Sequence, residues 1–242
     1  MTVQVPEIKP LDGKQKLMIE GFKKCITGNV IDAMEILGLS DFIRAVTVGL
    51  WPIDRSLPTM AGVAVTQHEG PRRVGATGYH LTQHAEVMRK MGPGHVMVTA
   101  AGGLLSSCNW GGLLNLEGMR RGMVGAVIDG VVRDVELMLR TKIPVFCRGT
   151  QPLACHYVMD TLNIQQPIVC AGVQVWPGDY VVGDADGVVF VPPDFADPVL
   201  ELALKKAEIE VKREEALWKT PLERLDEDVV NNPAYRPPRR DH

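Results

Sequence analysis

The sequence lacks several features that mark whole classes of protein. No apolar run approaches the roughly 20 residues that cross a bilayer, and residues 1–16 lack the basic-then-apolar layout of a secretory signal. No cluster of Lys and Arg exceeds two or three residues, and 26 basic against 29 acidic residues give a net charge of −3. We therefore expect a soluble, cytoplasmic protein that binds neither membranes nor nucleic acid.

Cysteine is scarce, and the common nucleotide and hydrolase motifs are missing. The five cysteines are an odd number without a CxxC pair, which argues against a zinc finger and against a disulfide scaffold. The nucleotide motifs GxGxxG and GxxxxGK[ST] do not occur, and neither does the GxSxG elbow of serine hydrolases. Ser106, Ser107 and Cys108 therefore support a nucleophile only as a minor hypothesis.

What is present is typical of a folded α/β domain. The 242 residues are 45% hydrophobic and 23% charged, which is enough apolar material for a sizeable core. Hydrophobic spacing predicts two helices within residues 13–38, and a loop that Gly102 and Gly103 open after a strand. Strand, loop, helix, strand and helix then follow in order, which predicts an α/β fold. We expect one domain over residues 1–218 and a polar, Pro-rich tail over residues 219–242.

The strongest local signal is an apolar strand, residues 125–132, that runs into Arg133 and Asp134. Ligands bind at the ends of strands in open α/β sheets. Arg offers a planar fork to a carboxylate or enolate oxygen, and Asp offers a hard oxygen to Mg²⁺ or Mn²⁺. On spacing alone, a surface ion pair at the start of a helix is an equally good interpretation.

Two further patterns are weaker. Gly111 and Gly112 precede a predicted helix, whose free N–H groups could receive a carboxylate, although taken alone the glycines favour a tight loop against a strand. His80 and His84 lie four residues apart with Glu86 beyond them, as two ligands of a transition metal could. The glutamate is misplaced for HExxH, so a packed or solvent-facing histidine pair is the favoured interpretation.

The spacing of these motifs resembles a known family. Gly112, followed after 20 intervening residues by Arg133 and Asp134, resembles the signature of the class II pyruvate aldolases related to the regulator of ribonuclease activity A. The resemblance covers about residues 27–212. Further segments are similar to that family in the same order, namely residues 27–33, 62–66, 92–94, 110–112, 143–146, 177–179 and 184–188.

The resemblance implies a fold and an activity. The fold is a compact α/β/β sandwich of the RraA-like, swivelling phosphohistidine-domain type, with N-terminal helices and a long C-terminal helix. It assembles as a homotrimer or a dimer of trimers. Enzymes of the family cleave 4-hydroxy-4-methyl-2-oxoglutarate or 4-carboxy-4-hydroxy-2-oxoadipate to pyruvate and a second keto acid, and often decarboxylate oxaloacetate. Both reactions leave a pyruvate enolate, which a divalent metal and a guanidinium stabilise.

The resemblance also assigns roles to residues. Asp134 would hold Mg²⁺ or Mn²⁺, and Arg133 would contact the keto oxygen of the substrate. The turn that contains Gly112, Leu113, Leu114 and Asn115 would hold the pyruvyl carboxylate through its backbone amides.

The base that takes the hydroxyl proton is left open. The candidates for a base or an outer metal contact are a metal-bound water, Asp32, Glu136, and Glu214 of a neighbouring subunit. The acid that follows the Arg-Asp pair in the aldolases is displaced by one position here, to Glu136, and one residue turns a helix by about 100°. Two alternatives therefore stay open: hydrolysis or dehydration of another polar substrate at the same metal site, and a non-catalytic protein that binds a ribonuclease.

Overall fold

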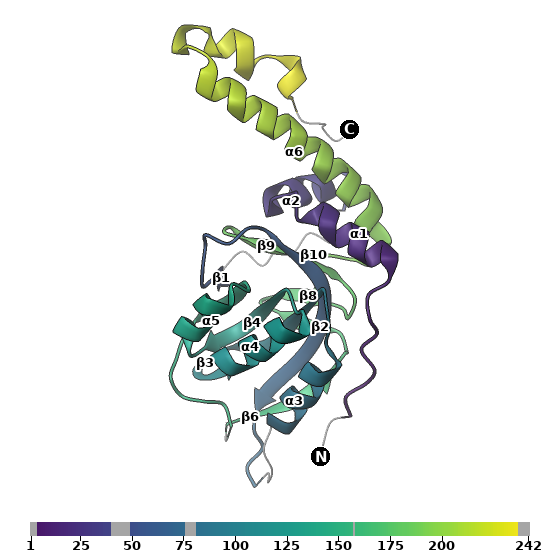
Figure 1. Ribbon diagram of the computed structural model, residues 1–242, viewed down its shortest axis with the longest axis vertical. Helices are drawn as coiled ribbons and strands as arrows, with labels where there is room; N and C mark the ends of the chain where they lie inside the picture. Colours follow the sequence, from purple (N-terminus) through teal and green to yellow (C-terminus); the bar gives the residue numbers. More distant parts are fainter. Residues whose placement is uncertain (1–3, 40–48, 76–80, 157, 237–242) are drawn as a thin grey trace.

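The computed structural model describes residues 4–39, 49–75, 81–156 and 158–236. Its centre is an eight-stranded mixed sheet in the order β1-β5-β4-β3-β2-β9-β10, with β6 also paired to β2. A separate two-stranded sheet is formed by β7 and β8 (Figure 1). The strands are β1 (Trp51–Pro52), β2 (Met60–Pro71), β3 (His95–Trp110), β4 (Gly125–Val132), β5 (Val145–Thr150), β6 (Met159–Ile164), β7 (Ile168–Cys170), β8 (Val173–Val175), β9 (Tyr180–Asp184) and β10 (Gly187–Val191).

Six α-helices are described around the sheets. Strands β2, β3, β4 and β5 run parallel, and helices α3, α4 and α5 lie in the connections between them. None of the described helices combines the length and the apolar character needed to cross a membrane. The helices are α1 (Gly13–Phe22), α2 (Thr27–Ile36), α3 (Leu81–Lys90), α4 (Gly112–Arg121), α5 (Val135–Thr141) and α6 (Ala196–Lys219).

The central strand β4 shows how the layers form. Every residue of β4 is buried, as expected for a parallel strand that is covered on both faces. Ala126 and Ile128 pack into the core beneath α3 and α5, whereas Val127 packs into the core on the other face of the sheet. That second core contains the apolar residues of β7 and β8. The molecule is thus a layer of helices, a large sheet and a small sheet, so the predicted α/β/β sandwich is confirmed.

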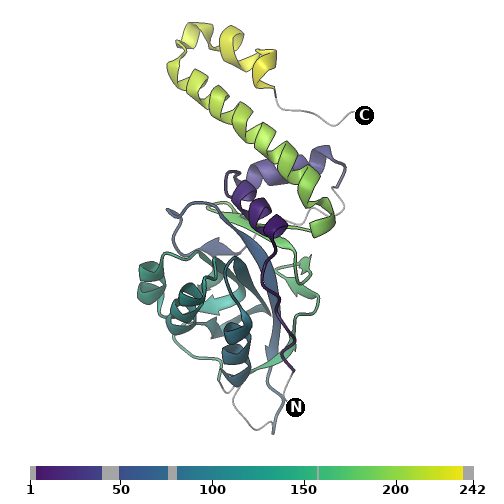
Figure 2. The same ribbon diagram turned by 45° about the vertical axis from the view of Figure 1, so that its right-hand side comes forward.

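Helices α1, α2 and α6 form a third core against β2, β9 and β10. The first half of α6 is buried there through residues such as Val199 and Ala203, whereas Val211 and Trp218 in its second half are exposed. Figures 1 and 2 show this second half projecting away from the sheets. The predicted N-terminal helices and long C-terminal helix are therefore both present.

Two segments differ from the expectations. The residues predicted to form a loop from Gly102 onward continue strand β3 to Trp110, with irregular register against β4. Gly102 and Gly103 have φ values of 61° and 71°, and they lie where the register between β3 and β4 shifts. A bulge of this kind lets a strand continue while it bends. The described part of the C-terminal tail forms three short helical turns, Leu222–Arg224, Asp226–Val230 and Pro233–Tyr235. The second and third pack against α6, and the first packs against the second.

The turn before β9 contains a buried carboxyl group. Asp179 is 4% exposed, and its Oδ2 accepts a hydrogen bond from the backbone N–H of Trp176 at 2.8 Å. Burial raises the pKa of Asp179 to about 6, from an ordinary value of 3.8. A carboxyl group whose pKa is higher in the folded state favours folding when protonated, so stability is lost as the pH rises from about 4 through 6.

We therefore expect Asp179→Asn to stabilise the protein at pH 8 by roughly 1–3 kcal/mol, because the amide keeps the acceptor and removes the buried charge. At pH 4 the difference should nearly vanish. Thermal melting at both pH values tests this, at about 2–4 °C per kcal/mol for a chain of this size. Asp186→Asn, in an exposed turn, is the matched control. An Asp179→Asn variant that loses stability relative to wild type at pH 8 would contradict the expectation.

Candidate active site

The candidate site lies where the parallel strands β3 and β4 end at the same edge of the sheet. β3 ends at Trp110, just before α4 begins at Gly112, and β4 ends at Val132, just before Arg133 and Asp134. The backbone N–H of Arg133 donates a hydrogen bond to the carbonyl oxygen of Trp110 at 3.1 Å. The sheet thus brings together Gly112 and the Arg133–Asp134 pair, at the edge where parallel sheets bind ligands.

Asp134 has an unusual backbone conformation. Its φ of 63° and ψ of 43° place it in the left-handed region, which few residues other than Gly, Asn and Asp adopt. The N–H of Gly112 donates to Asp134 Oδ2 at 3.3 Å, and Arg133 Nε lies 3.7 Å from the same oxygen. The side chains of Arg133 and Asp134 are 37% and 50% exposed. Strained residues of this kind cluster at functional sites.

Gly112 allows α4 and α5 to approach closely. A Cβ atom on Gly112 would lie 2.8 Å from Leu137 Cβ and 2.9 Å from Asp134 Cβ, closer than such atoms come in real structures. A Cβ on Gly111 would lie 3.3 Å from Asp134 Oδ2. These glycines therefore leave room for the Asp134 carboxylate beside the first turn of α4.

Asn115 has a structural role in this chain. Its side chain is fully buried, accepts a hydrogen bond from Trp110 Nε1 at 3.2 Å, and donates to Thr141 Oγ1 at 2.8 Å. Its backbone N–H donates to the carbonyl oxygen of Gly111 at 3.1 Å. The Asn115 N–H is therefore already hydrogen-bonded within the chain. Binding of a substrate carboxylate by backbone N–H groups stays a prediction for Leu113 and Leu114.

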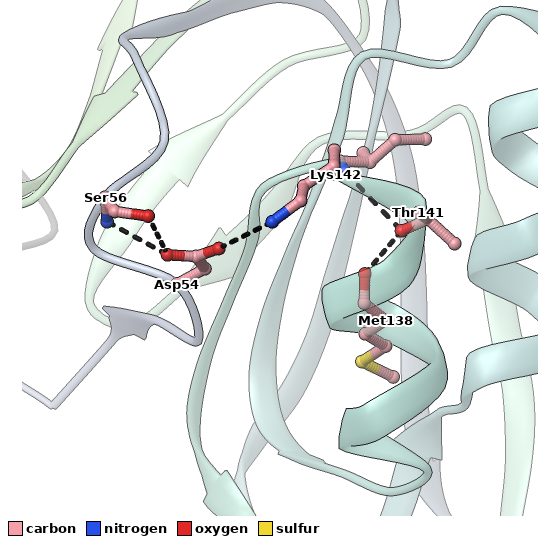
Figure 3. Close-up of polar contacts among 6 residues, drawn as sticks. Asp54, Ser56, Met138, Thr141 and Lys142 are labelled. Atoms are coloured by element: carbon pink, nitrogen blue, oxygen red, sulfur yellow. Dashed lines mark hydrogen bonds and ion pairs between the residues drawn. The ribbon is translucent and has the colours of Figure 1, made fainter.

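Thr141, which Asn115 contacts, is the last residue of α5. Thr141 Oγ1 donates to the carbonyl oxygen of Met138 at 2.6 Å, and Lys142 Nζ lies 3.9 Å from an Asp54 carboxylate oxygen that faces it across the loop (Figure 3). Asp54 in turn accepts hydrogen bonds from the backbone N–H and the hydroxyl of Ser56. These contacts lie at the C-terminal end of α5, whereas Asp134, just before its N-terminal end, is contacted by the Gly112 N–H.

A pocket of about 230 Å³ opens at this edge. Its wall comes from the ends of β3 and β4, the first turn of α4, helix α3, and a segment between β5 and β6 that a bridge from Cys108 to Ala154 holds in place. The lining residues are His84, Cys108, Asn109, Trp110, Gly111, Leu113, Leu114, Arg133, Asp134, Ala154, Cys155 and His156.

A buried polar network lies behind the pocket. Glu69 on β2 is 1% exposed, and its Oε1 lies 2.9 Å from His84 Nε2. The same oxygen accepts a hydrogen bond from Gln67 Nε2 at 2.8 Å, and Glu69 Oε2 accepts one from Asn109 Nδ2. Because His84 and Asn109 also line the pocket, this network connects the pocket to a buried carboxyl group.

One further histidine and two cysteines of the pocket have shifted pKa values. Burial, with the nearby charges of Arg133 and His84, lowers the pKa of His156. Burial raises the pKa of the Cys108 thiol, and it raises that of Cys155 to about 12. The thiols thus stay protonated near neutral pH, and a cysteine nucleophile has no support.

The three acidic residues predicted as a base or outer metal contact do not line the pocket of this chain. Asp32 forms an ion pair with Lys206 between α2 and α6. Glu136 is exposed in the first turn of α5, and Glu214 is exposed on the projecting half of α6, 3.4 Å from Trp218 Nε1. Any role for Asp32, Glu136 or Glu214 therefore stays a proposal. His80, considered with His84 as a metal pair, lies outside the described residues.

The donor set suits a particular kind of metal ion. Within the described ranges, no three His, Cys, Asp or Glu side chains are arranged to hold a metal ion together. Zinc usually takes at least three protein ligands, so the site does not fit zinc. Mg²⁺ keeps several waters and is commonly bound by one or two carboxylates together with substrate oxygens. The half-exposed carboxylate of Asp134 fits an ion of that kind.

Known proteins share this sequence and fold. Residues 27–190 match the family described as RraA-like, Aldolase/RraA, and this segment includes every residue that lines the pocket. The chain belongs to the RraA-like family. A Halalkalibacterium halodurans protein provisionally named 4-hydroxy-4-methyl-2-oxoglutarate aldolase is 36% identical over 132 residues, which are 54% of this chain and 62% of that protein.

Solved structures resemble this RraA-like chain over most of its length. Streptomyces coelicolor RraAS2, described as an unusual member of the RNase ES inhibitor RraA family, is 26% identical with a TM-score of 0.72, covering 86% of this chain and 99% of that one. A structure described among novel cellulases from gut-associated microbes is 25% identical with a TM-score of 0.75, covering 86% and 91%. The chain spans less than two thirds of the length of the first curated relatives that it matches.

Sequence reasoning missed part of this RraA-like pocket. Glu69, Asn109 and His156 were not singled out as site residues, and His84 was considered only as half of a metal pair. One signal was available. Gln67 and Glu69 alternate with His68 along an otherwise apolar strand, and both are buried, whereas His68 is only partly buried. A carboxylate in the buried face of a strand needs a partner, and here that partner is a pocket histidine.

Proposed function

We propose that this chain is a divalent-metal-dependent lyase that acts on a 2-oxo acid. It cleaves a 4-hydroxy-2-oxo acid to pyruvate and a second keto acid by retro-aldol reaction, and it decarboxylates oxaloacetate. The observation that carries the proposal is the meeting of Arg133, Asp134 and the first turn of α4 in one pocket. The name of the Halalkalibacterium halodurans relative supports the aldolase part.

The first turn of α4 binds the substrate carboxylate. The N–H groups at the start of a helix lack intrahelical acceptors and lie at the positive end of the helix dipole. Leu113 and Leu114 lie in this turn and line the pocket. Two backbone donors therefore fix the end of the substrate that is common to pyruvate and oxaloacetate.

Arg133 stabilises the charge that develops during the reaction. When the bond between C3 and its substituent breaks, the electron pair moves toward the C2 oxygen and leaves a pyruvate enolate. The Arg133 guanidinium donates hydrogen bonds to that oxygen, and donors at a developing oxyanion are each worth about 10²–10³ in rate. Asp134 would hold Mg²⁺ or Mn²⁺, and the ion supplies Lewis-acid polarisation when bound. One pocket thus serves both reactions.

A second candidate function is the binding of a ribonuclease without catalysis. The likeness to Streptomyces coelicolor RraAS2 favours it, because that protein is described as a member of an RNase ES inhibitor family. The structure described among novel cellulases suggests glycoside hydrolysis as a further possibility, but the pocket favours it less. Glycosidases place two carboxyl groups on either side of the scissile bond. Asp134 is the single carboxylate among the described residues that line the pocket.

The protein acts in the cytoplasm as a homotrimer or homohexamer in this proposal. The projecting part of α6 supports assembly, because Trp218 is 83% exposed there and Leu222 beyond it is 82% exposed. Burial of apolar side chains of this size against a neighbouring subunit would stabilise the assembly. Such packing would also decide whether Glu214 of a neighbouring copy reaches the pocket.

The test is pyruvate release by the purified protein from oxaloacetate and from 4-hydroxy-4-methyl-2-oxoglutarate. Each substrate is assayed with Mg²⁺, Mn²⁺ or a chelator, and corrected for decarboxylation by the metal alone. We expect release from both substrates that the chelator abolishes. No release from either substrate, together with stoichiometric binding to a ribonuclease, would overturn the lyase proposal and favour the second candidate.

A further inference from the structure

A second cavity, of about 540 Å³, lies on the side of the molecule that carries the small sheet. It is bounded by β8, the turn before β9, the end of β10 and the turn that leads into α6. It shares no lining residue with the pocket at Arg133. Its volume falls in the range of sites that hold small molecules, and the proposed lyase reaction makes no use of it.

The walls of this second cavity are rich in rings. Trp176, Phe190 and Phe195 line it together with three prolines. Phe190 is 5% exposed and belongs to the core under the small sheet, whereas Trp176 is 54% exposed to solvent. The faces of aromatic rings carry a negative potential, which attracts cations that lie within about 6 Å of the ring centre.

Every charged side chain that lines the second cavity, among the described residues, is acidic. Asp194 is exposed at its rim, and Asp179 is 4% exposed in its wall. The Asp179 carboxylate accepts one hydrogen bond, from the backbone N–H of Trp176 to Oδ2 at 2.8 Å. Within the described ranges of the chain, no cation and no second donor contacts it. Asp179 is thus a buried carboxylate that lacks a counter-ion in the chain itself.

Backbone hydrogen bonds fix Asp179 at this position. Its N–H donates to the carbonyl oxygen of Trp176 at 3.1 Å, and its own carbonyl oxygen accepts from the N–H of Ala64 on β2 at 2.8 Å. The N–H of Gly178 donates to the carbonyl oxygen of Ala64 at 3.0 Å. The carboxylate therefore cannot turn out into solvent without breaking this turn. Buried carboxylates are costly unless a cation compensates them, and sequences keep such costly groups mainly at functional sites.

We propose that the second cavity binds a free small molecule that carries a quaternary ammonium group, with the Asp179 carboxylate as its counter-ion and Trp176 against its methyl groups. The rings favour a methylated cation over a primary ammonium, whose three N–H donors each need an acceptor. A cavity lined by two carboxylates is repelled by the anionic surface of a membrane, so a free molecule is favoured over a lipid headgroup. This site does not depend on the proposed lyase function.

The experiment titrates the full chain with choline at pH 8 and follows the choline methyl signal by proton NMR. The uncharged isostere 3,3-dimethylbutan-1-ol, in which carbon replaces the ammonium nitrogen, tests whether the charge matters. Sodium chloride keeps the ionic strength constant. Asp179→Asn removes the carboxylate charge, while its amide oxygen can still accept the Trp176 N–H. Asp186→Asn, in an exposed turn outside the cavity, is the matched control.

We expect saturable binding of choline to wild type and at least about tenfold weaker binding of the isostere. Asp179→Asn should weaken choline binding at least about tenfold, and Trp176→Ala by about threefold to 30-fold. Asp186→Asn should bind choline as wild type does. Because Asp179→Asn is expected to be more stable than wild type at pH 8, a loss of binding in this variant would not result from unfolding.

Each of three results would overturn the cation site and leave the lyase function intact. They are equal binding of choline and its isostere, unchanged choline binding in Asp179→Asn, and no saturable binding of choline up to about 100 mM. Sedimentation with phosphatidylcholine vesicles is the last arm of the experiment. Binding to the vesicles that free choline competes away would overturn the assignment to a free molecule and point to a lipid headgroup.

Discussion

Replacing Asp134 by asparagine is expected to lower kcat/KM for pyruvate release from either substrate by at least about 10²–10³-fold. The substitution removes one charge and little else. Asparagine tolerates the left-handed conformation that Asp134 adopts, and its amide oxygen can still accept the hydrogen bond from the Gly112 N–H. The loss should therefore come from the metal-binding charge and not from unfolding.

The measurement is steady-state pyruvate release at saturating Mg²⁺ or Mn²⁺, together with a thermal melt. We expect the melting temperature of Asp134→Asn to stay close to that of wild type. Asp186→Asn, at an exposed turn between β9 and β10, controls for the loss of one negative charge. An Asp134→Asn protein that retains more than a tenth of wild-type kcat/KM would show that this carboxylate does not hold the catalytic ion.

The parts of the site that could be predicted are those that local sequence encodes. An apolar strand that ends in Arg133 and Asp134, and a glycine pair before a helix, each mark a strand end or a helix start. In a parallel sheet, neighbouring strands end at the same edge, so two such local marks predict one site. Gly112 and Asp134 do meet there, 3.3 Å apart through N–H and Oδ2.

The parts that could not be predicted depend on contacts between distant segments. Glu69 and His84 belong to different elements, and no periodicity relates them. The bulged end of β3 was predicted as a loop because its paired glycines and serines are typical of loops. Pairing with β4 and a bridge from Cys108 to Ala154 hold that segment as strand instead. Tertiary hydrogen bonds outweighed local propensity at this position.

Helix α6 contains one contact that the local sequence encodes and one that depends on a distant segment. Its exposed Glu201 and Lys205 form an ion pair at 2.6 Å, and their i,i+4 spacing is a local pattern that the sequence itself shows. The neighbouring Lys206 breaks the rule, because its side chain is only 4% exposed. Its partner Asp32 lies 174 residues earlier in the chain, on α2. No local pattern shows that one of two adjacent lysines is buried.

That buried pair gives the largest expected effect on stability. Asp32→Ala would leave the Lys206 ammonium buried without its carboxylate, which we expect to destabilise the protein by roughly 2–4 kcal/mol. This lies toward the low end for buried pairs, because Asp32 is itself 46% exposed and water screens its charge. Thermal melting should show a fall of roughly 4–16 °C. Lys205→Met, which breaks the exposed pair on the same helix, is the matched control and should change little.

The double variant Asp32→Ala/Lys206→Met separates structure from catalysis. Methionine fills the space of the lysine stem without a charge, so most of the lost stability should return. Asp32 was one candidate for the catalytic base, and the structure places it in the contact between α2 and α6, outside the pocket. If its role is structural, the double variant recovers pyruvate release along with its melting temperature. A double variant that is stable but inactive would instead return Asp32 to the chemistry, through a neighbouring subunit.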